Sequence, residues 1–195
     1  ALMRVAPIGV VGTNKTEKEI ASMAEAECVM TNLDQTCIDA NKVLSWAIAE
    51  AIRGEGHTFR LANYLVATCK KFGIEDSIQQ AIQRAMDGKH PPKGEQESAL
   101  FSLELALYAF LHTSSFEEGM GVVVMKGGSA NANASVYGAL AGAFYGDEGI
   151  PSRWKEELEV PETLARYIKK QTTFRRQNLS LEFMAESMAE KLLQL

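Results

Sequence analysis

The sequence has few of the residues that usually build redox or metal sites. It contains three cysteines, three histidines and five prolines in 195 residues. Cys28, Cys37 and Cys69 lie too far apart in the sequence for a CxxC zinc site. An odd number of cysteines is also not typical of a disulfide framework. We therefore expect three small buried side chains in a protein of a reducing, cytoplasmic compartment.

The sequence also lacks a long apolar run and an excess of positive charge. No segment approaches the ~18 consecutive apolar residues that suggest a membrane-spanning helix, and no signal peptide is visible. The net charge is −5 and the pI is near 5.3. A nucleic-acid binder would normally carry a basic face. We therefore expect neither a membrane nor a nucleic acid as a partner.

Familiar catalytic motifs are missing too. His57, His90 and His112 are isolated from one another and from other metal-ligating residues. The sequence contains no G-x-S-x-G nucleophile elbow, no P-loop and no G-x-G-x-x-G dinucleotide fingerprint. The residues alone thus identify no catalytic group.

What the sequence does contain is helical periodicity along most of its length. A capping box at Thr16–Glu19 begins one helix, and glycines follow several apolar segments where helix ends belong. The only strand-like run, GVVVM at 121–125, is short. We predict one all-α domain over residues 1–195 with about nine helices. Its main helices are expected at 33–53, 58–72, 76–86, 100–111, 131–145, 162–170 and 179–193.

The first residues are unusually apolar for a chain terminus. The sequence opens ALMRVAPIGV without an initiator methionine, and an apolar run from Val5 to Val11 follows almost at once. Free termini are normally polar and loosely held. This predicts that an upstream part of the protein is missing from the chain.

The stretch KGGSANANASVYGALAGAFYG, residues 126–146, allows two interpretations. Two glycines followed by neutral oxygen-bearing side chains indicate a ligand site at 127–133. The small residues further on, Gly138 and Gly142 among them, indicate a close-packed helix crossing. The second interpretation explains the helix but does not explain the Gly-Gly-Ser-x-Asn-x-Asn segment.

Three stretches together resemble the ADP-ribosylglycohydrolase family. ALMRVAPIG at 1–9 looks like its G-A-x-M-R-x-x-P-x-G segment, and CVMTNLDQTCIDANKVLSWAIAEAIRGE at 28–55 is similar to its T-H helix. The segment from Lys126 to Leu158 looks like its G-G-D-[TA]-D-T-x-A motif with the following I-P-x-x-W. The resemblance covers residues 1 to about 170 and corresponds to the C-terminal half of the family, with residues 171–195 as a C-terminal helix.

The resemblance implies an orthogonal all-α bundle, truncated at its N-terminus, and a site with two magnesium ions. The family's two motif Asp residues fall on Ser129 and Asn131, and its motif Thr falls on Ala132. The family His that contacts ADP-ribose falls on Asn32. Magnesium prefers carboxylate oxygens, so Ser129 and Asn131 are degenerate metal positions and magnesium is expected to be weak or absent. Asn32, Gly127 and Gly128 are the expected ligand-binding residues.

Three functional hypotheses follow from these observations. The first is a catalytically impaired or inactive member that binds ADP-ribose or an ADP-ribosylated protein. The second is an active magnesium-dependent hydrolase that removes ADP-ribose from modified proteins when an upstream half completes it. The third is a scaffold or interaction protein, in which an N-terminal half or self-association covers an apolar surface.

Overall fold

The computed structural model describes residues 1–54, 57–91 and 98–156, and these residues confirm the all-α prediction. They contain nine α-helices, three 3-10 helices and no strand. The predicted helices at 162–170 and 179–193 lie outside the described residues. The α-helices are α1 Ala6–Val11, α2 Glu17–Cys28, α3 Gln35–Arg53, α4 Thr58–Phe72, α5 Asp76–Met86, α6 Ala99–His112, α7 Phe116–Met125, α8 Ala130–Tyr145 and α9 Ser152–Glu156.

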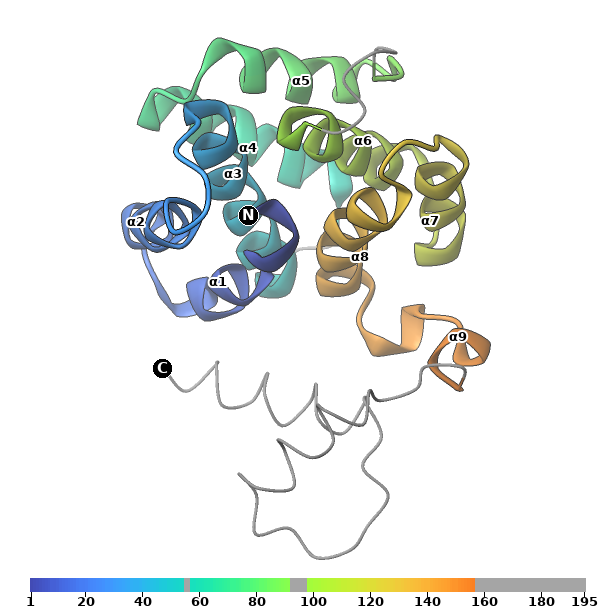
Figure 1. Ribbon diagram of the computed structural model, residues 1–195. Helices are drawn as coiled ribbons and strands as arrows, with labels where there is room; N and C mark the ends of the chain where they lie inside the picture. Colours follow the sequence, from blue (N-terminus) through green and yellow to red (C-terminus); the bar gives the residue numbers. More distant parts are fainter. Residues whose placement is uncertain (55–56, 92–97, 157–195) are drawn as a thin grey trace, which may run out of the picture.

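Helix α3 is the centre of the fold. It begins after Asp34, whose carboxylate accepts from the Cys37 backbone N–H, and it ends at Gly54, whose φ of 65° is the left-handed region that favours glycine. Helices α1, α2, α4, α6 and α8 all contact it (Figure 1). Trp46 is fully buried on α3, and its indole N–H donates to the Glu17 carbonyl at 2.9 Å. The core therefore surrounds one long helix instead of lying between two layers.

The N-terminal apolar run folds as α1 and packs on α3. The predicted capping box is present at the start of α2, where Thr16 and Glu19 bond each other's backbone N–H groups. The Arg53 guanidinium, at the end of α3, donates to the carbonyls of Gly12, Thr13 and Lys15 at 2.8, 3.1 and 2.9 Å. These bonds hold the 3-10 turn Gly12–Asn14 against the central helix.

Helices α7 and α8 meet at a glycine that the sequence interpretation did not single out. A side chain at Gly119 on α7 would overlap with the Tyr137 hydroxyl on α8. Gly138 and Gly142, which were expected to let another backbone approach, instead face the side chains of Met120 and Phe116 on α7. A helix crossing does exist at this face, but its closest approach depends on Gly119. The strand-like run at 121–125 is the end of α7.

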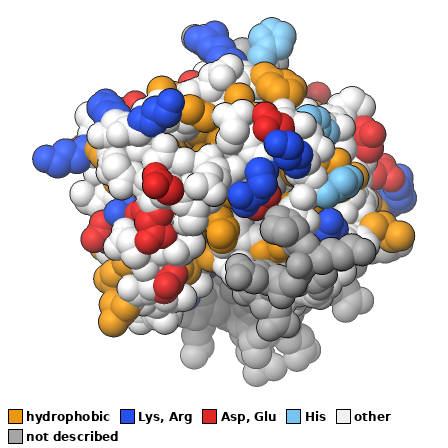
Figure 2. All heavy atoms as spheres, turned by 90° about the horizontal axis from the view of Figure 1, so that it is seen from above, with side chains coloured by type: hydrophobic (Ala, Val, Ile, Leu, Met, Phe, Trp, Pro, Cys, Tyr) orange, Lys and Arg blue, Asp and Glu red, His pale blue; other side chains and the backbone are white. Residues whose placement is uncertain are grey.

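The surface shows no concentration of one charge on the face drawn in Figure 2. Basic and acidic side chains are interspersed there. No helix in the described ranges is long and apolar enough to cross a membrane.

Candidate functional site

The Gly-Gly turn between α7 and α8 has the geometry that the sequence suggests. Gly127 and Gly128 have φ values of 77° and 67°, a left-handed conformation that side chains with a Cβ rarely adopt. The Gly128 carbonyl accepts from the Ala130 N–H at 2.8 Å. This tight turn places Ser129 at the N-cap of α8.

Ser129 and Asn131, the predicted degenerate metal positions, are neutral and only partly available. Ser129 is half-buried and makes no side-chain capping bond. Asn131 is exposed, and its side-chain oxygen accepts from the Ala132 N–H at 2.9 Å. The turn therefore offers backbone N–H groups, one hydroxyl and one amide, and it carries no negative charge.

Asn133 holds this turn to the rest of the bundle. It is fully buried, and its side-chain oxygen accepts from the Ser102 hydroxyl of α6 at 2.7 Å. Its amide group donates to the Gly127 carbonyl at 3.5 Å. The sequence interpretation counted Asn133 among possible ligand residues and missed this structural role. The signal was its place one turn before Val136 and Tyr137 on the apolar face of α8.

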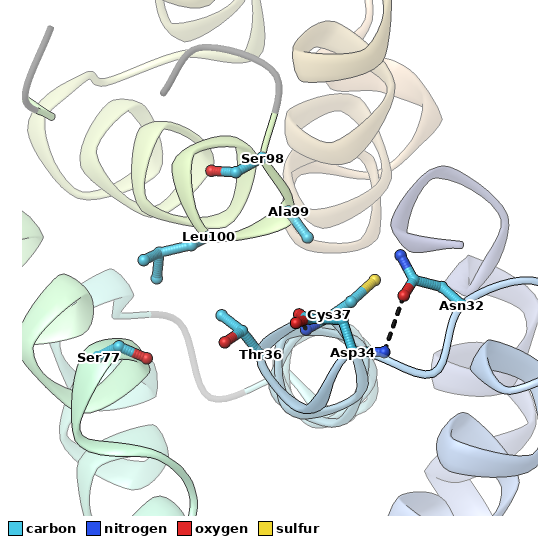
Figure 3. Close-up of a pocket in the computed structure, with 8 residues that line it drawn as sticks. All are labelled: Asn32, Asp34, Thr36, Cys37, Ser77, Ser98, Ala99 and Leu100. Atoms are coloured by element: carbon cyan, nitrogen blue, oxygen red, sulfur yellow. Dashed lines mark hydrogen bonds between the residues drawn. The ribbon is translucent and has the colours of Figure 1, made fainter. Parts of the chain in front are cut away.

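Asn32 lines a separate pocket of about 370 Å³ at the starts of α3, α5 and α6 (Figure 3). Its side-chain oxygen accepts from the Asp34 N–H at 2.9 Å. Most of the other groups that reach the pocket are hydroxyls or small side chains. The lining residues are Asn32, Asp34, Thr36, Cys37, Ser77, Ser98, Ala99 and Leu100.

Hydrogen bonds below the pocket fix the orientation of its hydroxyl groups. Thr36 and Ser77 both donate to the Glu75 carboxylate, at 2.6 and 3.4 Å. The Glu75 N–H in turn donates to the buried Asp39 carboxylate at 3.0 Å. The pocket is thus a hydrogen-bonding surface with a negative character, which suits the hydroxyl groups of a polar ligand.

The structure does not bring all five predicted site residues into one pocket. Gly127, Gly128, Ser129 and Asn131 are not among the described residues that line the Asn32 pocket. The Asn32 pocket and the Gly-Gly turn contact different residues near the start of α6. Ser98 to Leu100 line the pocket, and Ser102, one turn further, bonds Asn133 under the Gly-Gly turn. Helix α6 therefore links the two candidate regions.

The residues present do not fit a magnesium pair. Within the described ranges, no group of three or more His, Cys, Asp or Glu side chains could hold a metal ion. At the turn itself the side-chain donors are the neutral oxygens of Ser129 and Asn131, and the Asn131 oxygen already accepts a backbone bond. A hard divalent cation needs charged oxygens to offset the cost of its dehydration.

The histidines do not assemble into a site in the described part of the chain. His90 pairs with the Tyr108 hydroxyl at 3.1 Å, and His112 contacts the Ala85 carbonyl at 2.7 Å through Nε2. His57 precedes α4 as its N-cap residue. All three histidines are exposed, and the His57 side chain makes no capping bond.

The described residues form an all-α bundle in which a Gly-Gly turn precedes the small-residue helix α8. The ADP-ribosylglycohydrolase family profile matches residues 1–183, and the chain belongs to this family. This confirms the resemblance found in the sequence.

Individual relatives agree with this assignment. ADP-ribosyl-[dinitrogen reductase] glycohydrolase of Rhodospirillum rubrum is 24% identical over 126 residues, which cover 59% of this chain and 43% of that protein. ADP-ribosylhydrolase ARH3 of Gallus gallus is 31% identical over 78 residues, 34% of this chain and 21% of that protein. The chain therefore spans less than half the length of these curated relatives.

A solved structure shares the fold over nearly the whole chain. A chain of an ADP-ribosylglycohydrolase-related protein complex superposes with a TM-score of 0.74 at 27% identity. The alignment covers 99% of this chain and 58% of that chain. In that neighbour, the matching arrangement is part of a longer chain.

Proposed function

We propose that this chain binds ADP-ribose, free or attached to a protein, and that it does not hydrolyse the glycosidic bond. One observation supports this most directly. The Gly127–Gly128 turn has a left-handed backbone without Cβ atoms, which lets a ligand come close. Ser129 and Asn131 stand where the family motif has carboxylates. The turn thus has a backbone suited to ligand binding, but positions 129 and 131 carry no carboxylates for a metal-dependent reaction.

Binding and catalysis require different interactions from these residues. The Asn32 pocket offers hydroxyl and amide groups to the sugar, and the backbone N–H groups of the Gly-Gly turn suit the diphosphate. Stabilising a hydrolytic transition state requires stronger, charged interactions at the reacting centre. Neutral donors at 129 and 131 do not supply them.

Calorimetry with ADP-ribose in the presence and absence of magnesium tests this proposal. We expect binding that does not depend on magnesium, weakened by Asn32→Ala and unaffected by Asn63→Ala. Asn63 is a matched control because it is exposed on α4 and does not line the pocket. Tight binding that appears only with magnesium would contradict the proposal.

An active hydrolase completed by another segment is the second candidate. It is favoured by the coverage of the relatives, because this chain corresponds to 43% of the Rhodospirillum rubrum protein and 58% of the structural neighbour. The remaining part of the fold could contribute acidic ligands of its own. The deciding measurement is release of ADP-ribose from a modified protein with the complementary part of the fold supplied. Magnesium-dependent turnover would favour this candidate over the first.

A further inference from the structure

Two of the three cysteines, distant in sequence, lie side by side in the structure. Cys28 ends α2 and Cys37 lies in the first turn of α3, and their sulfur atoms are 3.8 Å apart. Both side chains are buried, with exposed fractions of 0% and 5%. The Asn41 amide group lies 3.4 Å from the Cys28 sulfur and 3.7 Å from the Cys37 sulfur. The pair therefore shares the Asn41 amide as a polar contact within a small hydrophobic cluster that includes Ile38.

The two thiols differ in their access to solvent. Cys37 lines the pocket that also contains Asn32 (Figure 3), so its side chain is the one of the pair that lies next to the pocket. Cys28 lies behind it and does not line the pocket. Burial raises the pKa of the Cys28 thiol to about 11, and the neighbouring Cys37 thiol adds to this effect. Cys37 is thus the sulfur that an oxidant would meet first.

The segment between the two cysteines carries Asn32. The Cys28 thiol also lies 3.7 Å from the Asn32 carbonyl, to which it can donate. The Asn32 N–H donates to the Cys28 carbonyl at 2.9 Å. A covalent bond between the cysteines would consequently close a short loop around Asn32 and remove the thiol hydrogen that its carbonyl uses.

We propose that Cys28 and Cys37 form a reversible disulfide when the protein meets hydrogen peroxide, and that this bond closes the loop that carries Asn32. The sulfurs must approach from 3.8 Å to about 2 Å. Rotation about the Cα–Cβ bonds of two unbranched side chains can provide this movement. The inference is independent of whether the chain binds ADP-ribose.

The reaction balances with peroxide as the only oxidant. The Cys37 sulfur attacks one peroxide oxygen, the O–O bond breaks, and the products are a Cys37 sulfenic acid and water. The Cys28 sulfur then attacks the Cys37 sulfur, the S–O bond breaks, and the departing hydroxide takes the Cys28 proton as a second water. Two thiols and one peroxide become one disulfide and two waters, and the two sulfurs together lose two electrons.

Peptide mapping of the peroxide-treated chain tests the proposal. We expect one Cys28–Cys37 cross-linked peptide, with a loss of two hydrogen atoms from the intact mass that dithiothreitol reverses. Cys69 is an internal control, because it is fully buried on α4 and does not line the pocket. Cys69→Ala should leave the cross-link unchanged, and Cys37→Ala should abolish it.

A second measurement does not depend on variants that could misfold. Closing the loop restricts the unfolded chain, so the oxidised wild-type protein should have a Tm several degrees above that of the reduced protein. Cross-links that involve Cys69, or a wild-type chain whose Cys28 and Cys37 stay free after peroxide treatment, would overturn the proposal.

Discussion

The start and the middle of helix α8 differ in how tightly they are packed. Its middle is a core element, with Val136, Tyr137 and Leu140 essentially inaccessible to solvent. Its start is a more accessible turn with neutral Ser129 and Asn131, the residues predicted to align with the family's carboxylates. Burial constrains volume and shape, whereas an exposed turn can exchange a carboxylate for an amide without loss of the fold. One helix thus combines a part whose residues are constrained by packing with a turn whose residues are less constrained.

The largest expected effect is on the packed part of α8. Leu140→Ala should reduce the free energy of unfolding by about 2–5 kcal/mol, because it leaves a cavity at a fully buried position. Ser129→Ala, at the turn, should change it by no more than about 0.5 kcal/mol. Chemical denaturation of both variants measures the contrast. Equal losses would show that the turn is as tightly constrained as the core.

Tyr137 makes the packed part sensitive to alkaline pH. Burial raises the pKa of its phenol from 10.0 to about 12. The unfolded chain loses this proton first, so the stabilisation is complete below pH 10 and is lost as pH rises towards 12. We expect Tyr137 to account for about 2 kcal/mol of this loss. Denaturation curves across this range should show a smaller loss in Tyr137→Phe, and an identical loss would refute the assignment.

The hydrogen bond that joins the turn to α6 should have an intermediate effect. Ser102→Ala removes the donor to the buried Asn133 oxygen, which should cost about 1–3 kcal/mol. Ser135→Ala is the matched control, since Ser135 is exposed on α8, the helix of Asn133, and its hydroxyl donates to the Asn131 carbonyl within that helix. Thermal denaturation of the two variants separates them. A larger effect at Ser135 would mean that Asn133 does not anchor the turn.

Restoring the family's motif should have the smallest effect in energy but the most informative one. The triple change Ser129→Asp, Asn131→Asp and Ala132→Thr should raise magnesium affinity at least about tenfold, equivalent to about 1.4 kcal/mol. Calorimetry with magnesium chloride measures it, with Ala132→Thr alone as the control. If the triple variant gains nothing even with the complementary part of the fold supplied, the alignment of the turn with the motif is wrong.

Local signals allowed most of the described fold to be predicted. The ends of α3 and α4 fall at Gly54 and Gly73, as expected from the glycines that follow their apolar segments. The strand-like run at 121–125 is helical, because the apolar side chains of α7 pack on α8 and tertiary contacts outweigh β-branched propensity. Short-range sequence patterns predict most helices well, but they do not decide between helix and strand for a short β-branched run.

The candidate site was less predictable, because its parts meet only through the tertiary fold. The glycine turn could be found from composition and family resemblance, and Asn32 from the resemblance. The pocket around Asn32 could not, since it also needs Ser77 and Ser98 from two other helices. The Cys28–Cys37 contact could not be predicted for the same reason. The two residues are nine positions apart on different helices, and their sulfurs meet only because the chain turns between α2 and α3.

The contact between Gly119 and Tyr137 has a consequence for the history of the family. A larger side chain at 119 cannot enter while the Tyr137 ring and hydroxyl fill the space beside it. Position 119 can therefore take a larger residue only after the side chain at 137 has made room. Across homologous sequences, a larger residue at position 119 should therefore occur together with a smaller residue at position 137. Such correlated substitutions would reflect the packing of α7 against α8.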